Sequence, residues 1–279
     1  MPESDSLKNL AVHTITHKPW SARQCIDKFA EAGVTGVTFW LKDFEDDTPS
    51  QIGDYARVAG LDVVSVARGG FFCAKNTLRR QALLNDNYRA IAQTAEAGAP
   101  SLVLVCGAWP GQTLEESRKQ ILEGIEYILP RAQDAGVKLA IEPLHPLYAD
   151  DRSAINTMAT ANAICDQLGS PEHLGIAVDV YHTWWDPDLE NQIRIAGEKN
   201  RLFGFHICDW KTPTTDLLND RGIMGEGCID IATIQKWVKS AGFQGHDEVE
   251  IFSNTHWDSD QDEYLGKIIE GYQAIERLA

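Results

Sequence analysis

The chain has 279 residues, of which 43% are hydrophobic and 24% are charged, as in ordinary globular proteins that bury a sizeable core. Its 41 acidic residues outnumber the 25 basic ones and give a formal net charge of −16 at pH 7. A surface of this sign repels phosphate backbones and anionic lipids, so we expect neither nucleic acid nor a membrane as a partner.

Short apolar and β-branched runs alternate with longer helical patterns along the chain. Runs such as SLVLVC (101–106) and GIAVDV (175–180) are typical of parallel strands that are covered on both faces. In chain order, the eight predicted strands span residues 10–15, 34–40, 61–67, 101–107, 137–143, 174–181, 202–209 and 247–253.

Helix-start signals lie in the intervals between these strands. Ser21 with Gln24 and Thr113 with Glu116 form capping-box patterns, and Asp230 opens a third helical pattern, as such residues commonly do. Glycines that commonly end a helix follow these three patterns at Gly33, Gly136 and Gly242.

This alternation, without a linker or low-complexity segment, predicts one α/β domain over residues 1–279, a single (β/α)8 TIM barrel. A doubly wound open sheet is the alternative, but no Gly-rich nucleotide-binding turn follows a strand. In a TIM barrel the active site lies at the carboxyl ends of the strands, so catalytic side chains should gather there.

The six cysteines form no C-x-x-C pair, and the first residues, MPESDSLKNL, contain no apolar leader. No stretch of the sequence approaches 18 continuous apolar residues, the length of a membrane-spanning helix. We therefore expect free thiols and a cytoplasmic protein.

Ionisable residues occupy the ends of the last four predicted strands. Glu142 lies in the fifth, Asp179 in the sixth, His206 in the seventh and Glu250 in the eighth. A carboxylate in an apolar strand is costly to bury unless a positive group compensates it. Any one of them alone would be explained as an ion-pair partner, but four on neighbouring strands predict a shared divalent cation.

Three oxygen ligands and one nitrogen, without a thiolate, favour a hard ion. We expect one divalent cation, Mn²⁺ first, with Mg²⁺, Co²⁺ and Zn²⁺ as alternatives.

Further polar residues follow the candidate ligands. His145, His182 and Asp209 each lie three residues beyond one of them, and Arg221 lies in the glycine-flanked loop at 219–227. These four side chains are placed to contact a substrate above the metal, with His145 as an additional acid or base. Asp209 alternatively orients a neighbouring ligand as a hydrogen-bond acceptor, and Arg221 alternatively is a solvated surface residue.

Tryptophans cluster at the same ends of the strands. Trp40, Trp109 and Trp184 are the candidates for substrate contact among them. Because aromatic faces stack on the C–H surfaces of sugar rings and exclude water, such a mouth suits a sugar.

The chain resembles the xylose isomerase-like TIM barrels, the sugar phosphate isomerase/epimerase superfamily that also includes the AP endonuclease 2-type barrels. The resemblance covers essentially the whole chain and rests on IEP (141–143), VDVYH (178–182), FHICD (205–209), DRGIMGEG (220–227) and VEIF (249–252). It implies that Glu142, Asp179, His206 and Glu250 bind the metal. It also implies that His182 and Arg221 contact substrate oxygens.

The sequence departs from two branches of that superfamily. Ketose 3-epimerases often carry another glutamate six residues beyond the first metal ligand, where this chain has Tyr148. The DNA-repair branch uses a larger ligand set and a basic groove, which this acidic chain does not offer. His145 and the aromatic mouth resemble the large subunits of bacterial C-glycoside deglycosidases, which act on 3-keto glycosides together with a small subunit.

The predicted function is that of a divalent-metal-dependent isomerase or epimerase of a keto sugar, in which Glu142 and Glu250 move a proton next to a carbonyl through an enediolate. The alternative is a lyase or hydratase on 3-keto glycosides, or an inosose dehydratase, with His145 as the base. A third, non-catalytic alternative is a sugar-binding subunit. We expect a homo-oligomer or a small partner subunit and, since no phosphate-binding loop occurs, an unphosphorylated sugar.

Overall fold

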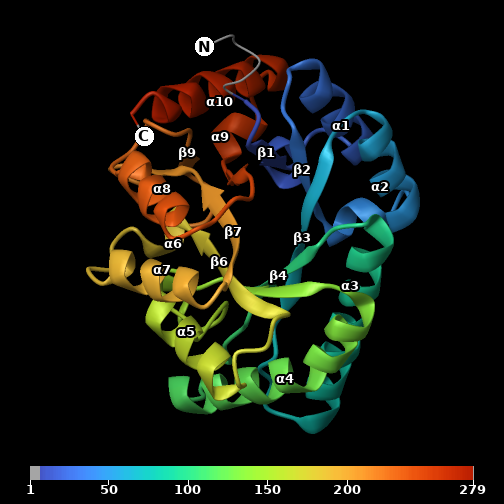
Figure 1. The fold of residues 1–279 in the computed structure, drawn as a ribbon, viewed down its shortest axis with the longest axis vertical. Helices are drawn as coiled ribbons and strands as arrows, with labels where there is room; N and C mark the ends of the chain where they lie inside the picture. Colours follow the sequence, from blue (N-terminus) through green and yellow to red (C-terminus); the bar gives the residue numbers. More distant parts are fainter. Residues whose placement is uncertain (1–6, 279) are drawn as a thin grey trace.

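Eight parallel strands form a closed barrel at the centre of the protein (Figure 1). The computed structural model describes residues 7–278. The barrel strands are β1 (Leu10–His13), β2 (Gly36–Trp40), β3 (Asp62–Gly70), β4 (Ser101–Val105), β5 (Lys138–Ile141), β6 (Leu174–Asp179), β7 (Leu202–Ile207) and β10 (Asp247–Val249). Their hydrogen-bonded order is β1-β10-β7-β6-β5-β4-β3-β2, and β1 also pairs with β2. The open-sheet alternative is therefore wrong, and the protein is a (β/α)8 TIM barrel.

Each predicted strand coincides with one barrel strand, but the ends differ. The third strand continues to Gly70, beyond its predicted end at residue 67, whereas the last one stops at Val249. Glu142 and Glu250 consequently lie just after β5 and β10, and their backbone N–H groups still donate to Leu104 and Ile207 of the neighbouring strands.

Helices surround the barrel (Figure 1). They are α1 (Ala22–Glu31), α2 (Pro49–Val58), α3 (Thr77–Ala97), α4 (Leu114–Ala135), α5 (Met158–Gln167), α6 (Val180–Thr183), α7 (Leu189–Glu198), α8 (Ile231–Ser240), α9 (Asn254–Trp257) and α10 (Gln261–Glu276), with short 3₁₀ turns at Thr14–His17, Leu41–Phe44 and Pro146–Tyr148. Both predicted capping boxes are present at α1 and α4, and Asp230 caps α8. Among the described residues, no helix has both the length and the apolar character required to cross a bilayer.

A short antiparallel hairpin, β8 (Asp209–Trp210) with β9 (Arg221–Gly222), was not predicted. It forms within the loop that follows β7 and pairs Trp210 with Arg221. This pairing carries Arg221 into the protein, where it is only 3% exposed. The hairpin thus converts a residue of a surface-like loop into part of the barrel mouth.

The barrel interior differs from the apolar layer between strands and helices. A cluster of small apolar side chains occupies part of it, formed by Ala67, Val103, Ala140 and Ala177. Ionisable side chains, including His13, His206 and Glu248, are also completely or almost completely buried. Small neighbours leave room for these polar groups and for the cavity above them.

Candidate metal centre and active site

Four ionisable side chains meet at the carboxyl end of the barrel. They come from four strands that are neighbours in the order β5, β6, β7, β10. One ligand atom from each of Glu142, Asp179, His206 and Glu250 lies within 4.8 Å of the other three. All four residues are at most 4% exposed. The four side chains that the sequence singled out are therefore brought together in one buried cluster.

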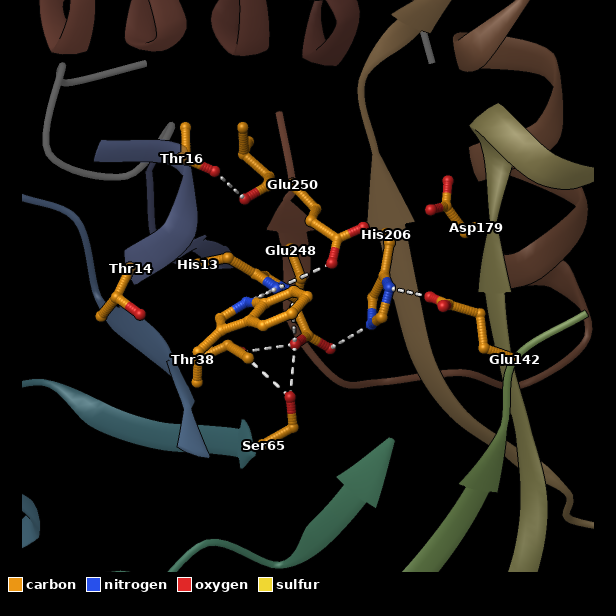
Figure 2. A network of polar contacts seen from close by, with 12 residues as sticks. His13, Thr14, Thr16, Thr38, Ser65, Glu142, Asp179, His206, Glu248 and Glu250 are labelled. Carbon is orange, nitrogen blue, oxygen red and sulfur yellow. Dashed lines mark hydrogen bonds and ion pairs between the residues drawn. The ribbon is translucent and has the colours of Figure 1, made fainter. Parts of the chain in front are cut away.

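Direct contacts already link these side chains in pairs. Nδ1 of His206 lies 2.8 Å from Oε1 of Glu142 (Figure 2). Arg221 donates from Nη1 to Oδ2 of Asp179 at 3.1 Å and to Oε2 of Glu250 at 2.8 Å. The guanidinium of Arg221 therefore neutralises part of the negative charge of the cluster.

The donor set fits a divalent cation. Three carboxylates surround one imidazole, and Arg221 supplies a single positive charge beside them. A divalent ion adds the remaining two charges, and carboxylate and imidazole ligands without thiolate suit Mn²⁺, Mg²⁺ or Zn²⁺. Glu142, Asp179, His206 and Glu250 are the residues that could hold it.

Burial and nearby charges act differently on the two carboxylates that Arg221 contacts. For Asp179, burial dominates the effect of Arg221 and raises the pKa to about 7. For Glu250, burial is outweighed by Arg221 and by His13 and His206, so its pKa lies well below the usual range. Burial lowers the pKa of His206, but the negative charges of Glu248, Glu142 and Glu250 outweigh it and raise the pKa to about 10. A protonated imidazole and a metal ion are alternative ways to balance these carboxylates.

Glu248 and His13 extend the cluster toward the barrel interior, and sequence reasoning missed both. Nε2 of His13 lies 3.4 Å from Oε2 of Glu248, and its Nδ1 lies 3.4 Å from Oε1 of Glu250. Oε1 of Glu248 lies 3.8 Å from Nε2 of His206. Figure 2 shows Glu248 beneath both imidazole rings, with Glu142 reaching His206 from the other side.

Hydrogen bonds hold the carboxylate of Glu248 in place. Its Oε2 accepts from Oγ1 of Thr38 at 2.6 Å and from Oγ of Ser65 at 2.8 Å. Burial raises the pKa of Glu248, but the charge of His206 and the contacts with His13 and Thr38 outweigh it and lower the pKa to about 2. Glu248 is therefore an ionised group behind the candidate metal ligands. Its position two residues before Glu250 was a usable signal, because alternate residues of a strand share a face.

A cavity of about 320 Å³ opens above this cluster. Both candidate catalytic carboxylates, Glu142 and Glu250, line it, as do the predicted substrate contacts His182, Arg221 and Trp40. This size lies within the range of small-molecule sites. A larger cavity of about 540 Å³ opens around strand starts such as those at Lys138 and Leu202, the end of a TIM barrel that rarely carries catalysis.

His182 lies between the cavity and the ion cluster. Its Nε2 lies 3.2 Å from Nη2 of Arg221. Burial, followed by the charge of Arg221, lowers the pKa of His182 well below its usual value. Its Nδ1 accepts the backbone N–H of His145 at 3.3 Å, so both ring nitrogens of the neutral His182 are engaged with the protein.

Four other predicted site residues lie elsewhere. The carboxylate of Asp209 accepts four backbone N–H groups, from Trp210, Gly225, Gly227 and Ile229. Both of its oxygens therefore organise the loop that follows β7. This position does not support the prediction that Asp209 contacts substrate or orients a metal ligand.

His145 does not line the cavity. Its Nδ1 accepts the backbone N–H of Leu147, and its ring packs 5.0 Å from that of Trp210. Trp184 also packs on Trp210, at 5.9 Å between ring centroids, while Trp109 is 38% exposed. None of His145, Trp109 and Trp184 lines the cavity, although the backbone N–H of His145 donates to Nδ1 of His182 at 3.3 Å.

Comparisons with known proteins agree with this architecture. The sequence profile of a family described as "Xylose isomerase-like TIM barrel" matches residues 26–273. A comparison with functionally curated protein sequences found no match. The crystal structure of protein SMc04130 from Sinorhizobium meliloti 1021 is similar at a TM-score of 0.93 and 40% sequence identity, covering 96% of this chain and 98% of that one.

Two more distant structures share the fold. The IOLI protein with a bound zinc atom is 18% identical at a TM-score of 0.81, covering 96% of this chain and 97% of that one. The 3-keto-D-glucoside 4-epimerase YcjR from E. coli is 17% identical at a TM-score of 0.77, covering 96% and 99%.

Proposed function

The chain belongs to the xylose isomerase-like TIM barrel family, and on this premise we propose that it is a divalent-metal-dependent isomerase or epimerase of a keto sugar. The convergence of Glu142, Asp179, His206 and Glu250 beside a cavity is the observation that carries the proposal. The name of one structural neighbour, a 3-keto-D-glucoside 4-epimerase, supports the same reaction class, and the zinc atom of another supports a divalent cation.

The metal in this proposal is held by Glu142, Asp179, His206 and Glu250. When bound, a divalent cation supplies Lewis-acid stabilisation of negative charge on the substrate oxygens. Mn²⁺ is the proposed ion, because carboxylate oxygens dominate the donor set.

Proton transfer in this proposal belongs to the two glutamates. Glu142 follows β5 and Glu250 follows β10, two strands that are not neighbours in the barrel, and both side chains line the same cavity. One carboxylate removes the proton from the carbon next to the carbonyl, and the other, which carries a proton of its own, donates that proton to the enediolate. Return to the opposite face yields an epimer, and return to the neighbouring carbon yields an isomer. Arg221 donates a hydrogen bond to a substrate oxygen, and His182 orients that group.

Neither alternative function gains comparable support. A lyase or hydratase that uses His145 as its base needs that imidazole at the reacting carbon, but His145 caps a turn and packs on Trp210. Burying several carboxylates at the carboxyl end of the barrel costs stability, and a subunit that only binds a sugar has no need for them.

Hydrogen exchange with solvent tests the proposal. The protein, loaded in turn with Mn²⁺, Mg²⁺, Co²⁺ and Zn²⁺, is incubated in deuterated water with neutral and acidic keto sugars and 3-keto glycosides. We expect deuterium incorporation next to the carbonyl of at least one compound. Glu142→Gln and Glu250→Gln should each slow it by about 10²–10⁴-fold.

The exposed Glu96 of α3 offers a matched control, since Glu96→Gln removes one carboxylate far from the cluster. Its exchange rate should equal that of the unmodified protein. Absence of exchange with every metal and compound contradicts the proposed reaction, and normal exchange in Glu250→Gln removes Glu250 from its proposed role.

A further inference from the structure

Two arginines without carboxylate partners line the cavity that contains Glu142 and Glu250. Arg68 and Arg152 both belong to its wall. The guanidinium of Arg68 lies over the ring of Phe71 at 4.4 Å, and that of Arg152 lies 5.8 Å from the ring of Tyr148. Within residues 7–278, neither guanidinium forms an ion pair or a hydrogen bond.

The two arginines that are almost completely buried, Arg201 and Arg221, are compensated. Arg221 pairs with Asp179 and Glu250, and Arg201 pairs with Asp166. Arg68, by contrast, is partly buried without an ion pair, and burial together with the nearby charge of Arg152 lowers its pKa, against the smaller opposing effects of Glu142 and Glu250. Two positive charges that face one cavity repel each other, and an anion bound between them relieves that repulsion.

The carboxylates of the metal cluster are neutralised without Arg68 and Arg152. A divalent cation and Arg221 together neutralise the three carboxylates of Glu142, Asp179 and Glu250, and the ionised Glu248 lies against His13 and His206, whose pKa values are raised. The positive charges of Arg68 and Arg152 then remain on the cavity wall, joined by Lys18, whose Nζ lies over the ring of Trp257 at 4.5 Å. On a protein with a net charge of −16, such a basic wall concentrates anions at the site.

We propose that the substrate is a keto sugar that carries an acidic group, a carboxylate or a phosphate, and that Arg68 and Arg152 bind this group. A phosphate would depart from the expectation of an unphosphorylated sugar, which considered only phosphate-binding loops. The inference rests on the proposed function, because it assumes that the carbonyl end of the same molecule faces Glu142 and Glu250. Guanidinium groups suit this task, since they bind oxyanions through two parallel hydrogen bonds and remain charged. The rings of Phe71, Trp40 and Tyr148 keep the guanidinium planes oriented.

D-Fructose and two derivatives that differ from it only at position 6 provide the test. D-Fructose is neutral, D-fructuronate carries a carboxylate and D-fructose 6-phosphate carries a phosphate. Binding of each to the Mn²⁺-loaded protein is measured by calorimetry at low ionic strength, where charge effects are not screened. We expect at least one acidic sugar to bind about 10-fold or more tightly than D-fructose, and the preferred one identifies the acidic group.

Variants assign that preference to the two arginines. Arg68→Met and Arg152→Met should abolish it while D-fructose binding changes by less than about 2-fold, since the neutral sugar makes no charge-assisted contact. Arg68→Gln and Arg152→Gln give the same comparison should a Met variant fail to fold. Arg131→Met removes an exposed charge of α4 and should retain the preference.

The outcomes separate this inference from the proposed function. Equal or undetectable binding of the three sugars to the unmodified protein overturns the inference, as does a preference that survives in both Met variants. Loss of the preference in Arg131→Met also overturns it, because overall charge then explains the effect. The exchange assay reports on the proposed function independently, so exchange without an anionic preference removes only the inference. An anionic preference with no exchange removes the proposed reaction.

Discussion

Nη1 of Arg221 lies 2.8 Å from Oε2 of Glu250, and both residues are at most 4% exposed. The pair places a permanent cation against a carboxylate that we propose as a metal ligand. Because Arg221 also contacts Asp179, it compensates the cluster before any metal is added.

Replacing Arg221 should therefore destabilise the chelated protein strongly. Arg221→Met leaves Glu250 and Asp179 without their permanent cation, and breaking such a buried pair costs about 3–5 kcal/mol of unfolding free energy. Urea unfolding with EDTA should show this loss, and saturating Mn²⁺ should restore part of it. Arg221→Lys, which keeps the charge, should lose less. Equal stability of Arg221→Met and the unmodified protein would contradict the assigned ion pairs.

Glu248 should influence metal affinity without binding the metal. Its carboxylate lies 3.8 Å from Nε2 of His206, on the opposite side of the ring from Nδ1 and Glu142. Glu248 favours the tautomer of His206 with its proton on Nε2, which leaves Nδ1 free to bind the metal. Carboxylates that hold a metal-binding histidine in this way typically contribute 10–100-fold to metal affinity. Titration of chelated protein with Mn²⁺ should show about 10-fold weaker binding for Glu248→Gln.

Thr38 provides the graded comparison for that experiment. Thr38→Val removes a 2.6 Å hydrogen bond to Glu248 but leaves the carboxylate charge, so its affinity should fall less. Unchanged Mn²⁺ affinity in Glu248→Gln would show that Glu248 does not act through His206.

His17 should make stability depend on pH independently of the metal. Its ring is fully buried and stacks on Trp20 at 4.5 Å. Burial lowers the pKa of His17 from 6.5 to about 4. Between those values the unfolded chain binds a proton that the folded protein does not, so stability falls as the pH decreases from 6.5 to 4, by up to about 3 kcal/mol.

The measurement compares unfolding free energies of the unmodified protein and His17→Phe across this pH range. Phenylalanine preserves the aromatic packing and cannot titrate, so the variant should lose less stability as the pH falls. Parallel pH profiles for the two proteins would exclude His17 as the source.

Two helical glycines should respond to alanine in opposite directions. At Gly53 of α2, an added Cβ would lie 2.1 Å from the carbonyl oxygen of Ala97, at the end of α3. Gly53→Ala should therefore destabilise the protein by about 1–3 kcal/mol through overpacking. At Gly266 of α10 nothing lies within 4 Å of that position, so Gly266→Ala should stabilise by about 0.5–1 kcal/mol. Thermal unfolding of both variants checks the contrast, and equal shifts would contradict it.

The number of barrel strands, their sequence positions and the carboxylates at their ends could all be predicted from the sequence. These features are encoded locally, because apolar runs, capping boxes and glycines act on neighbouring residues. The common direction of parallel strands then placed Glu142, Asp179, His206 and Glu250 at one end. The same alternation that exposes Glu250 to the interior could also have identified Glu248.

Only the tertiary structure decided which groups face the cavity. Closure of the barrel pairs β1 with β10, which brings His13 beside Glu248 and Glu250. Arg68 lies near the end of β3 and Arg152 lies in the segment between β5 and α5, and no local pattern predicts that they share a cavity wall. The side chains of Asp209 and His145 bind backbone N–H groups of their own loops and do not face the cavity. Loop conformation depends on contacts between residues that are distant in sequence, and those contacts exist only once the chain has folded.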